Sequence, residues 1–184
     1  IHGREFSKIP EFIAIQLNDT HPVIAIPELM RILVDIEGVL WEDAWEIVKK
    51  TFSYTNHTIL AEALEKWPLE YLEEVVPDIV QIIKKLDKIV KIQYNNENVQ
   101  IIDKEDRVHM ANMDIHFSSS VNGVAYLHTE ILKNSELKDF YEIYPEKFNN
   151  KTNGITFRRW LESCNEDLAD YLKELIGTGY LTNA

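Results

Sequence analysis

Three short polar segments interrupt otherwise apolar sequence, and their residue types suit the binding of sugars. They span residues 17–22, 54–58 and 150–156, and each combines amides and hydroxyls with a histidine or a lysine. Amide and hydroxyl groups can donate or accept hydrogen bonds, and they carry no charge that must be desolvated. The segments therefore predict a site for a neutral ligand with many hydroxyl groups.

The first of these segments admits other interpretations. Asp19 and His21 alternate in sequence and could present two metal ligands, but no third ligand is close and His57 lies in a different segment, so a metal site is disfavoured. Asp19 or Thr20 could instead cap the helix that follows.

The Asn153-Gly154 pair in the third segment favours a positive backbone torsion or a tight turn before an apolar and aromatic helix start. The pair could be a plain turn. It could also be a hinge between two domains at which Asn153 presents its amide to a ligand in the cleft.

The elements that position these segments are mainly helical. Residues 12–17 form an apolar run that predicts a buried strand in a parallel sheet, with the first polar segment at its carboxyl end. Apolar periodicity predicts helices that follow Pro22 and end at Gly38, and that cover residues 42–51, 76–90, 121–132 and 165–176. One strand does not complete a parallel sheet, so we expect the partner strands outside this sequence.

Composition narrows the class of protein. A chain of 184 residues is one domain or a large piece of one, and its net charge of −12 disfavours binding to nucleic acid or to an anionic membrane. No run approaches the roughly 20 apolar residues of a membrane span. The single Cys164 excludes an internal disulfide, fits a reducing compartment and is expected to be a small buried apolar side chain.

Many ordered segments together resemble the glycogen, starch and maltodextrin phosphorylases, the α-glucan phosphorylase family. The resemblance covers nearly the whole chain, in the same order and with similar spacing. It rests on residues 14–22, 25–31, 44–47, 54–60, 62–68, 110–112, 121–125, 145–148, 150–156 and 158–161.

The resemblance implies a fold as well as a family. It implies an α/β class, in which this chain is a mainly helical fragment of a two-domain, Rossmann-like glycosyltransferase fold of the GT-B type. Residues 1–153 would be the later part of the N-terminal domain, and residues 154–184 the crossover into the C-terminal domain.

The implied reaction is the cleavage of a terminal α-1,4-linked glucose by inorganic phosphate, which yields α-D-glucose 1-phosphate. The implied cofactor is pyridoxal 5′-phosphate, whose phosphate group assists proton transfer. The lysine that holds the cofactor has no counterpart here, so we expect the chain alone to be inactive and to bind no cofactor. The intact enzyme would be a cytoplasmic homodimer that acts on α-1,4-glucan.

The resemblance also implies roles for individual residues. His57 would be catalytic, and it would contact the glucose together with Asn153 around the 6-hydroxyl. The other implied positions are Asp19 and His21 along the route of the glucan, Val121 and Asn122 at the border of the glucose pocket, and Trp160 beside the cofactor. No metal site is implied.

Two alternatives belong to other classes of protein. The chain could be a carbohydrate-binding module without catalysis, or a structural helical domain in which the polar segments are caps and turns. The preferred glucan and any allosteric control are left open at this point.

Overall fold

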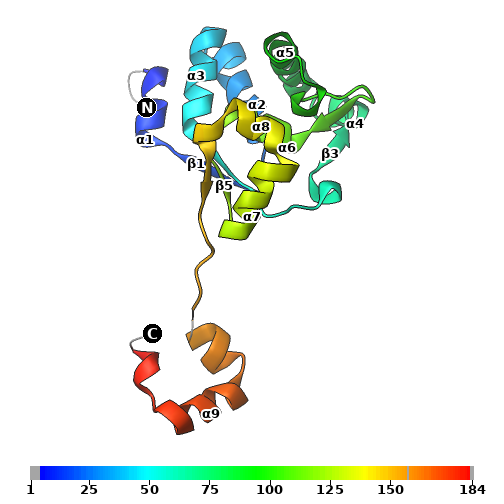
Figure 1. The fold of residues 1–184 in the computed structure, drawn as a ribbon. Coiled ribbons are helices and arrows are strands. Elements are labelled where there is room, and N and C mark those ends of the chain that lie inside the picture. The colour runs from blue at the N-terminus through cyan, green and yellow to red at the C-terminus, as the bar shows by residue number, and fades with distance from the viewer. Residues whose placement is uncertain (1–4, 157, 183–184) are drawn as a thin grey trace. The chain divides into compact units, whose positions relative to one another are not determined.

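The computed structural model describes residues 5–156 and 158–182 (Figure 1). The chain forms two compact units, Ile1–Lys151 and Thr152–Ala184. The boundary expected from the sequence, between residues 153 and 154, lies two residues further along. The assignment of the two units to the domains of a larger enzyme remains a prediction.

The first unit is a mixed α/β structure around a four-stranded parallel sheet. Its strands have the order β1-β2-β5-β6 and are β1 (Ile15–Asn18), β2 (Phe52–Thr55), β5 (Val121–Gly123) and β6 (Phe148–Asn150). The prediction that the partner strands lie outside this sequence was therefore wrong. The missed strands have only three or four residues, which is too short for an alternating pattern to stand out from neighbouring helices.

Strand β1 is shorter and more exposed than the apolar run predicted. The run begins in a helical turn, α1 (Ile9–Phe12), so the strand starts only at Ile15. Within the strand only Leu17 is buried. The reason is its place at the edge of the described sheet, where one side has no neighbouring strand.

Helices surround the sheet, and several agree with the predicted periodicity. Helix α3 (Trp41–Thr51) matches the second predicted helix, and α5 (Pro77–Gln93) begins at its proline and buries the predicted apolar stripe. The others are α2 (Ala25–Arg31) with the π-helical segment η2 (Ile32–Ile36), α4 (Leu69–Val75), α6 (Met110–Phe117), α7 (Tyr126–Ile131) with η5 (Leu132–Glu136), and α8 (Lys138–Ile143).

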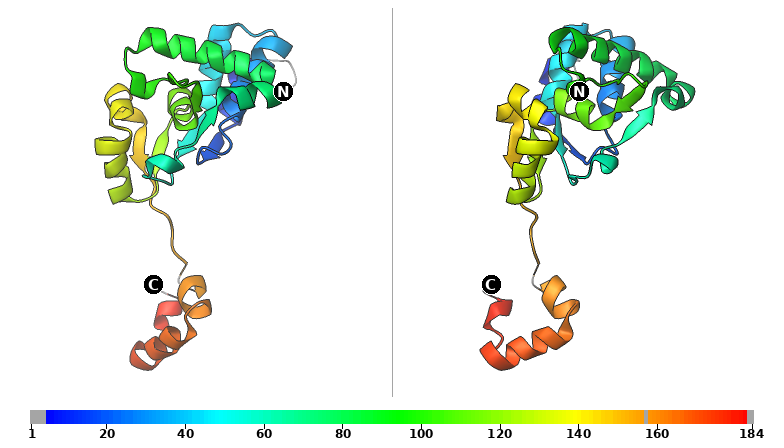
Figure 2. Two further views of the ribbon diagram at one scale, coloured as in Figure 1. Left: turned by 90° about the vertical axis from the view of Figure 1, so that its right-hand side faces the viewer. Right: turned by 45° about the vertical axis from the view of Figure 1, so that its right-hand side comes forward.

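The helix predicted over residues 121–132 is split between two kinds of structure. Val121 belongs to strand β5, and helix α7 begins only at Tyr126. Helix α7 lies beside strands β5 and β6 (Figure 2). A separate two-stranded antiparallel sheet pairs β3 (Lys66–Pro68) with β4 (Arg107–His109).

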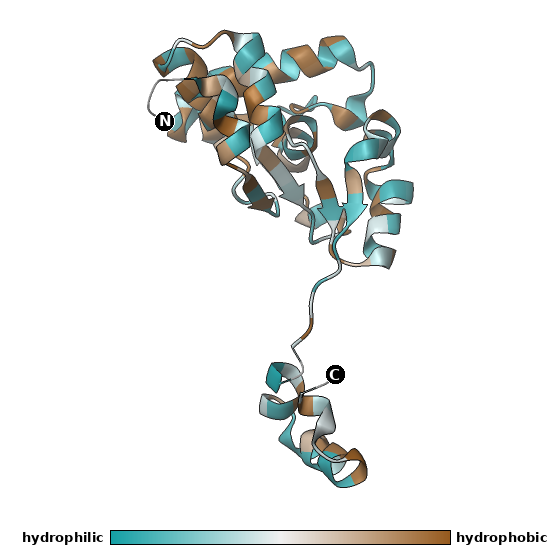
Figure 3. Cartoon of the chain, turned by 90° about the vertical axis from the view of Figure 1, so that its left-hand side faces the viewer, coloured by the Kyte–Doolittle hydropathy of each residue, from teal (hydrophilic) through white to brown (hydrophobic). Residues whose placement is uncertain are grey.

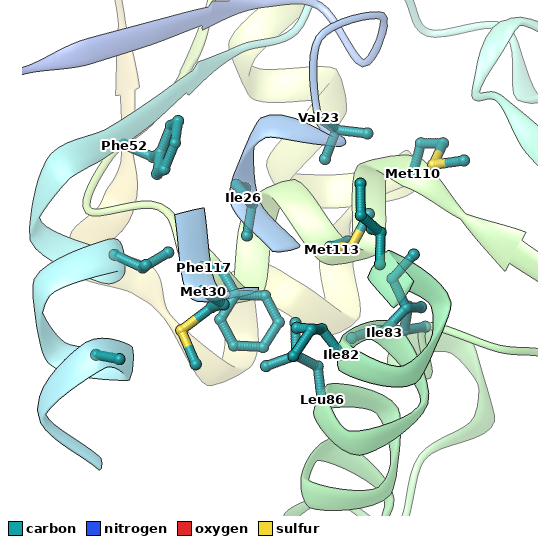
Figure 4. Packing of buried hydrophobic residues seen from close by; sticks show 14 of the residues in the cluster. Val23, Ile26, Met30, Phe52, Ile82, Ile83, Leu86, Met110, Met113 and Phe117 are labelled. Atoms are coloured by element: carbon teal, nitrogen blue, oxygen red, sulfur yellow. The ribbon is translucent and has the colours of Figure 1, made fainter. Parts of the chain in front are cut away.

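The core joins one row of sheet residues to the helices. Leu17, Tyr54, Val121 and Phe148 are in register across the four strands, and all four are buried. Side chains of α2, α5 and α6 pack together nearby, as Figure 4 shows for Met30, Leu86 and Phe117 and their neighbours. Full burial of one such side chain contributes roughly 1.5–3 kcal/mol to folding.

Helix α6 is buried along its whole length. It carries two ionisable side chains, Asp114 and His116, into this interior. Lys147 donates hydrogen bonds from Nζ to the carbonyl oxygens of Ile115 (2.8 Å) and His116 (3.2 Å) at the end of the helix. Burial lowers the pKa of Lys147 to about 8.

The second unit contains the π-helical segment η7 (Arg158–Ser163), helix α9 (Glu166–Ile176) and the short turn η8 (Gly179–Leu181). The predicted ends of α9 are confirmed, because Asn165 Oδ1 accepts from the Leu168 amide and Gly177 has a φ of 76°. Cys164 is exposed, so the prediction of a buried cysteine was wrong. In α9 only Ala169 is buried, and the unit offers little interior for a cysteine.

Gly154 does not have the positive backbone torsion that the sequence favoured; among the described glycines only Gly38 and Gly177 have one. Residues 151–156 run without helix or strand, and nothing lies within 4 Å of a Cβ built at Gly154. A tight turn at this position is therefore ruled out. In the part of the chain described, no helix is both long and apolar enough to cross a membrane.

Candidate functional site

A row of polar residues crosses the sheet directly after the buried apolar row. Asn18, Thr55, Asn122 and Asn149 are paired in register across β1, β2, β5 and β6. Successive strand residues point to opposite faces, so this row lies on the face opposite the apolar row. Figure 3 shows the change from hydrophobic to hydrophilic residues along β5 and β6. The carboxyl ends of all four strands are therefore polar.

Side-chain hydrogen bonds join this row across neighbouring strands and tie it to Gln16 in β1. Gln16 Nε2 donates to Thr55 Oγ1, which donates in turn to Asn122 Oδ1, both over 2.8 Å. The main-chain pairing continues beyond the strands, because the amides of Asp19 and Asn56 donate to the carbonyl oxygens of Thr55 and Asn122 over 2.9 Å each. The strand ends are thus held in a fixed arrangement.

The first and second polar segments meet at His57. The His57 ring lies in an exposed position, and its Nε2 is 2.5 Å from Asn18 Oδ1. The amide oxygen can only accept, so Nε2 carries the ring proton. Within residues 5–156 and 158–182 no hydrogen bond to His57 Nδ1 is found, so this nitrogen is oriented but available to a ligand.

His21, also exposed, reaches a residue outside the three segments. Its Nδ1 lies 2.5 Å from Glu65 Oε1, which sits just before strand β3. Sequence analysis gave Glu65 no functional role, since a pairing over 44 positions leaves no local signal. The Asp19 and His21 side chains have different hydrogen-bond partners, and no cluster of three or more metal-binding side chains occurs in the described residues.

Asp19 forms a strained turn after strand β1. Its φ is 71°, in the left-handed region, and its Oδ1 accepts from the Thr20 amide over 2.8 Å. The Thr20 hydroxyl is buried, and no described residue forms a hydrogen bond with it. Thr20 therefore does not cap helix α2, and Asp19 shapes the turn instead.

Val121 and Asn122 occupy the interior of the sheet. Val121 is fully buried in a hydrophobic cluster. The side-chain amide of Asn122 accepts from Thr55 Oγ1 through its Oδ1, and its Nδ2 donates to the Gly123 carbonyl over 3.0 Å. Their side chains are thus engaged within the protein. Their role at the border of a glucose pocket remains a prediction.

The start of the third polar segment lies beside strand β5. The Lys151 amide donates to the Gly123 carbonyl over 3.0 Å, and Thr129 Oγ1 lies 3.1 Å from Asn150 Oδ1. Asn153 and Trp160 belong to the second unit, and both are exposed. Their roles also remain predictions.

His128 and Asn56 add a contact that sequence analysis missed. His128 lies in the helix predicted over residues 121–132, and its Nε2 is 3.1 Å from Oδ1 of Asn56, the residue directly before His57 in the chain. Asn56 is fully buried, and its Nδ2 donates to the Tyr54 hydroxyl over 2.9 Å.

An uncompensated carboxyl group lies in the interior near this edge. Asp114 is completely buried, and neither of its carboxyl oxygens has a hydrogen-bond partner among the described residues. Desolvation raises the pKa of Asp114 well above its ordinary value, and the charges of Asp19 and Glu65 raise it further. Burial and the same three carboxyl groups also raise the pKa of Tyr54.

The sequence matches known proteins along its whole length. The family model described as carbohydrate phosphorylase matches residues 1–184. The maltodextrin phosphorylase of Streptococcus pneumoniae serotype 4 is 60% identical over 178 residues, which cover 97% of this chain and 24% of that protein.

Animal proteins are similar to a lesser degree. The brain form of glycogen phosphorylase from Rattus norvegicus is 50% identical over 189 residues, covering 97% of this chain and 23% of its own length. The liver form from Ovis aries is 51% identical over 187 residues, covering 96% and 22%. The chain spans about a quarter of the length of these relatives, and it belongs to the carbohydrate phosphorylase family.

Proposed function

We propose that this chain is part of an α-glucan phosphorylase that cleaves the terminal α-1,4-linked glucose of a glucan with inorganic phosphate. The products would be α-D-glucose 1-phosphate and a shortened glucan. The observation that carries the proposal is the meeting of polar segments at the carboxyl ends of parallel strands, where open α/β sheets bind their ligands. The larger enzyme would have the two-domain GT-B fold, with this chain supplying part of its N-terminal domain and the crossover.

His57 is the proposed catalytic residue. Asn18 takes the proton-bearing Nε2, so Nδ1 is left to accept from a sugar hydroxyl. A fixed dipole of this kind costs no reorganisation when charge develops on the sugar in the transition state. Asn153 would contribute a second contact to the 6-hydroxyl, and Asp19 and His21 would line the glucan route.

Pyridoxal 5′-phosphate would supply a phosphate group that exchanges protons with inorganic phosphate. The described residues fit this cofactor only in part. The Trp160 indole is 56% exposed and offers a flat apolar face, but one indole does not enclose a cofactor. The residues that would enclose the cofactor therefore belong to the remainder of the proposed phosphorylase.

The proposed partners follow from the same assignment. They are an α-1,4-glucan, inorganic phosphate, the remainder of the phosphorylase and a second copy of it in a homodimer. A net charge of −12 disfavours nucleic acid and anionic lipid as partners. We place the enzyme in the cytoplasm, where a single free cysteine stays reduced.

The test is phosphorolysis by the full-length protein. Wild-type enzyme should release glucose 1-phosphate from a maltooligosaccharide when phosphate is present. His57→Ala should lower kcat by on the order of 10²-fold with little change in KM for the glucan, because a transition-state contact is lost.

Other results would reassign the chain. Binding of maltooligosaccharide without phosphorolysis by the wild-type protein would support the carbohydrate-binding module. An equal loss of glucan affinity and of kcat/KM, with kcat at saturation unchanged, would assign His57 to binding alone.

A further inference from the structure

Glycine at position 123 brings the start of helix α7 against the end of strand β5. A Cβ at Gly123 would lie 2.4 Å from Thr129 Oγ1 and 3.0 Å from His128 Nδ1. The first distance is shorter than real Cβ contacts, and the second is tighter than most of them, so any larger residue here would force Thr129 or His128 to shift. The approach places His128 next to the strand ends that carry the site.

The two nitrogens of His128 have different partners. The Val124 amide donates to Nδ1 over 3.1 Å, so Nδ1 is an acceptor. The neutral ring then carries its proton on Nε2, which donates to Asn56 Oδ1 over 3.1 Å. Both nitrogens are thus used inside the protein, and His128 does not have a free nitrogen to offer a ligand.

Asn56 transmits this contact to the chain around His57. Its Oδ1 also accepts from the main-chain amide of Thr58 over 3.0 Å. The main-chain amide of Asn56 donates to the Asn122 carbonyl over 2.9 Å. The peptide is therefore held on both sides of His57. His57 itself is exposed, and the one hydrogen bond found for its ring among the described residues is that to Asn18.

We propose that His128 is a positioning residue for His57. It fixes the Asn56 amide, and Asn56 fixes the turn from which the His57 ring reaches the edge of the sheet. This inference rests on the proposed function for its catalytic consequence, while the hydrogen bonds on which it depends are independent of that function.

A purely structural role makes a different prediction, and two substitutions separate the two roles. His128→Asn keeps an acceptor near the position of Nδ1 for the Val124 amide but does not reach Asn56. His128→Gln keeps a donor near the position of Nε2 for Asn56 but loses the acceptor for Val124. A positioning role requires Gln to behave more like histidine, whereas a role in starting helix α7 requires Asn to do so.

The first measurement is amide hydrogen exchange over residues 54–60 in the full-length protein. We expect exchange about fivefold faster in His128→Asn, the factor that corresponds to one lost hydrogen bond, and near wild type in His128→Gln. Unchanged exchange in His128→Asn, or the opposite order of the two variants, would overturn the proposal.

The second measurement is the kinetics of glucan phosphorolysis. His128→Asn should lower kcat roughly tenfold, since small displacements of a catalytic group cost about that much or more, and KM should stay within about twofold. His128→Gln should restore most of kcat. Faster exchange with unchanged kcat would overturn the link to His57. If the wild-type protein shows no phosphorolysis, the proposed function fails, and hydrogen exchange alone decides whether His128 positions the turn.

Discussion

The Nε2 atom of His57 lies 2.5 Å from Oδ1 of Asn18, across 39 positions of sequence. Asn18 is the last residue of β1, and His57 follows the end of β2. The parallel pairing of β1 with β2 brings the two residues together. The contact fixes which nitrogen of the ring carries the proton. Asn18 at the end of β1 thus determines that His57, which follows β2, can offer its Nδ1 to a ligand as an acceptor.

Substitution of Asn18 tests this relationship. Asn18→Ala removes the acceptor, so the His57 ring can rotate and its Nδ1 is no longer oriented. We expect kcat of the full-length enzyme to fall about tenfold, with a smaller change in KM. The control is Asn95→Ala, in an exposed loop. Wild-type kinetics in Asn18→Ala would show that His57 does not depend on this contact.

Two glycines provide a matched pair for stability. Gly123→Ala should lower the free energy of unfolding by about 1–3 kcal/mol, because its Cβ would collide with Thr129 and His128. Gly154→Ala should change it by less than about 0.5 kcal/mol, since the surrounding space is open. Urea unfolding of both variants measures the difference, and equal effects would contradict the close packing at Gly123.

His116 predicts a loss of stability in acid. Its Nε2 donates to the Val99 carbonyl (2.7 Å), its Nδ1 accepts from the Tyr144 hydroxyl (3.0 Å), and burial lowers its pKa to about 4. The unfolded state therefore binds more protons than the folded state between pH 6.5 and 4. As the pH falls through that window, the free energy of unfolding decreases by roughly 3 kcal/mol.

The matched variant for this prediction is His116→Gln. Glutamine keeps a donor for the Val99 carbonyl and does not titrate. Urea unfolding at several pH values should give a flatter profile between pH 6.5 and 4 than the wild type gives. Parallel profiles would show that another group causes the acid sensitivity.

Asp114 predicts the opposite dependence on pH. Its pKa is raised, so the folded state retains a proton that the unfolded state loses above its ordinary pKa, and stability declines as pH rises. Asp114→Asn removes the titration and keeps the size of the side chain. The stability of this variant relative to wild type should increase between pH 5 and pH 8 in urea unfolding. A constant difference would show that Asp114 ionises as easily in the folded protein as in the unfolded one.

The chain by itself should show no phosphorylase activity and no stable binding of pyridoxal phosphate. The family resemblance places the cofactor lysine in sequence outside these residues, and Trp160 alone does not enclose a cofactor. Reconstitution, dialysis, borohydride reduction and peptide mapping provide the measurement. A single lysine of this chain that is labelled stoichiometrically would contradict the expectation.

Local features of the fold followed from the sequence. The apolar stripe of α5, the cap of α9 at Asn165 and the positive φ at Gly177 depend on residues within one or two helical turns. The interactions that decide such features act between near neighbours, so their signals lie in adjacent sequence.

The tertiary structure alone decided the arrangement of the site. Strands β2, β5 and β6 are too short to have a period of their own, and they exist because parallel neighbours pair with them. The contacts of His57 with Asn18, of His21 with Glu65 and of His128 with Asn56 join residues 39, 44 and 72 positions apart. The types of the polar residues indicated a carbohydrate ligand, but strand pairing and register determined which of them meet, because those depend on contacts between distant parts of the chain.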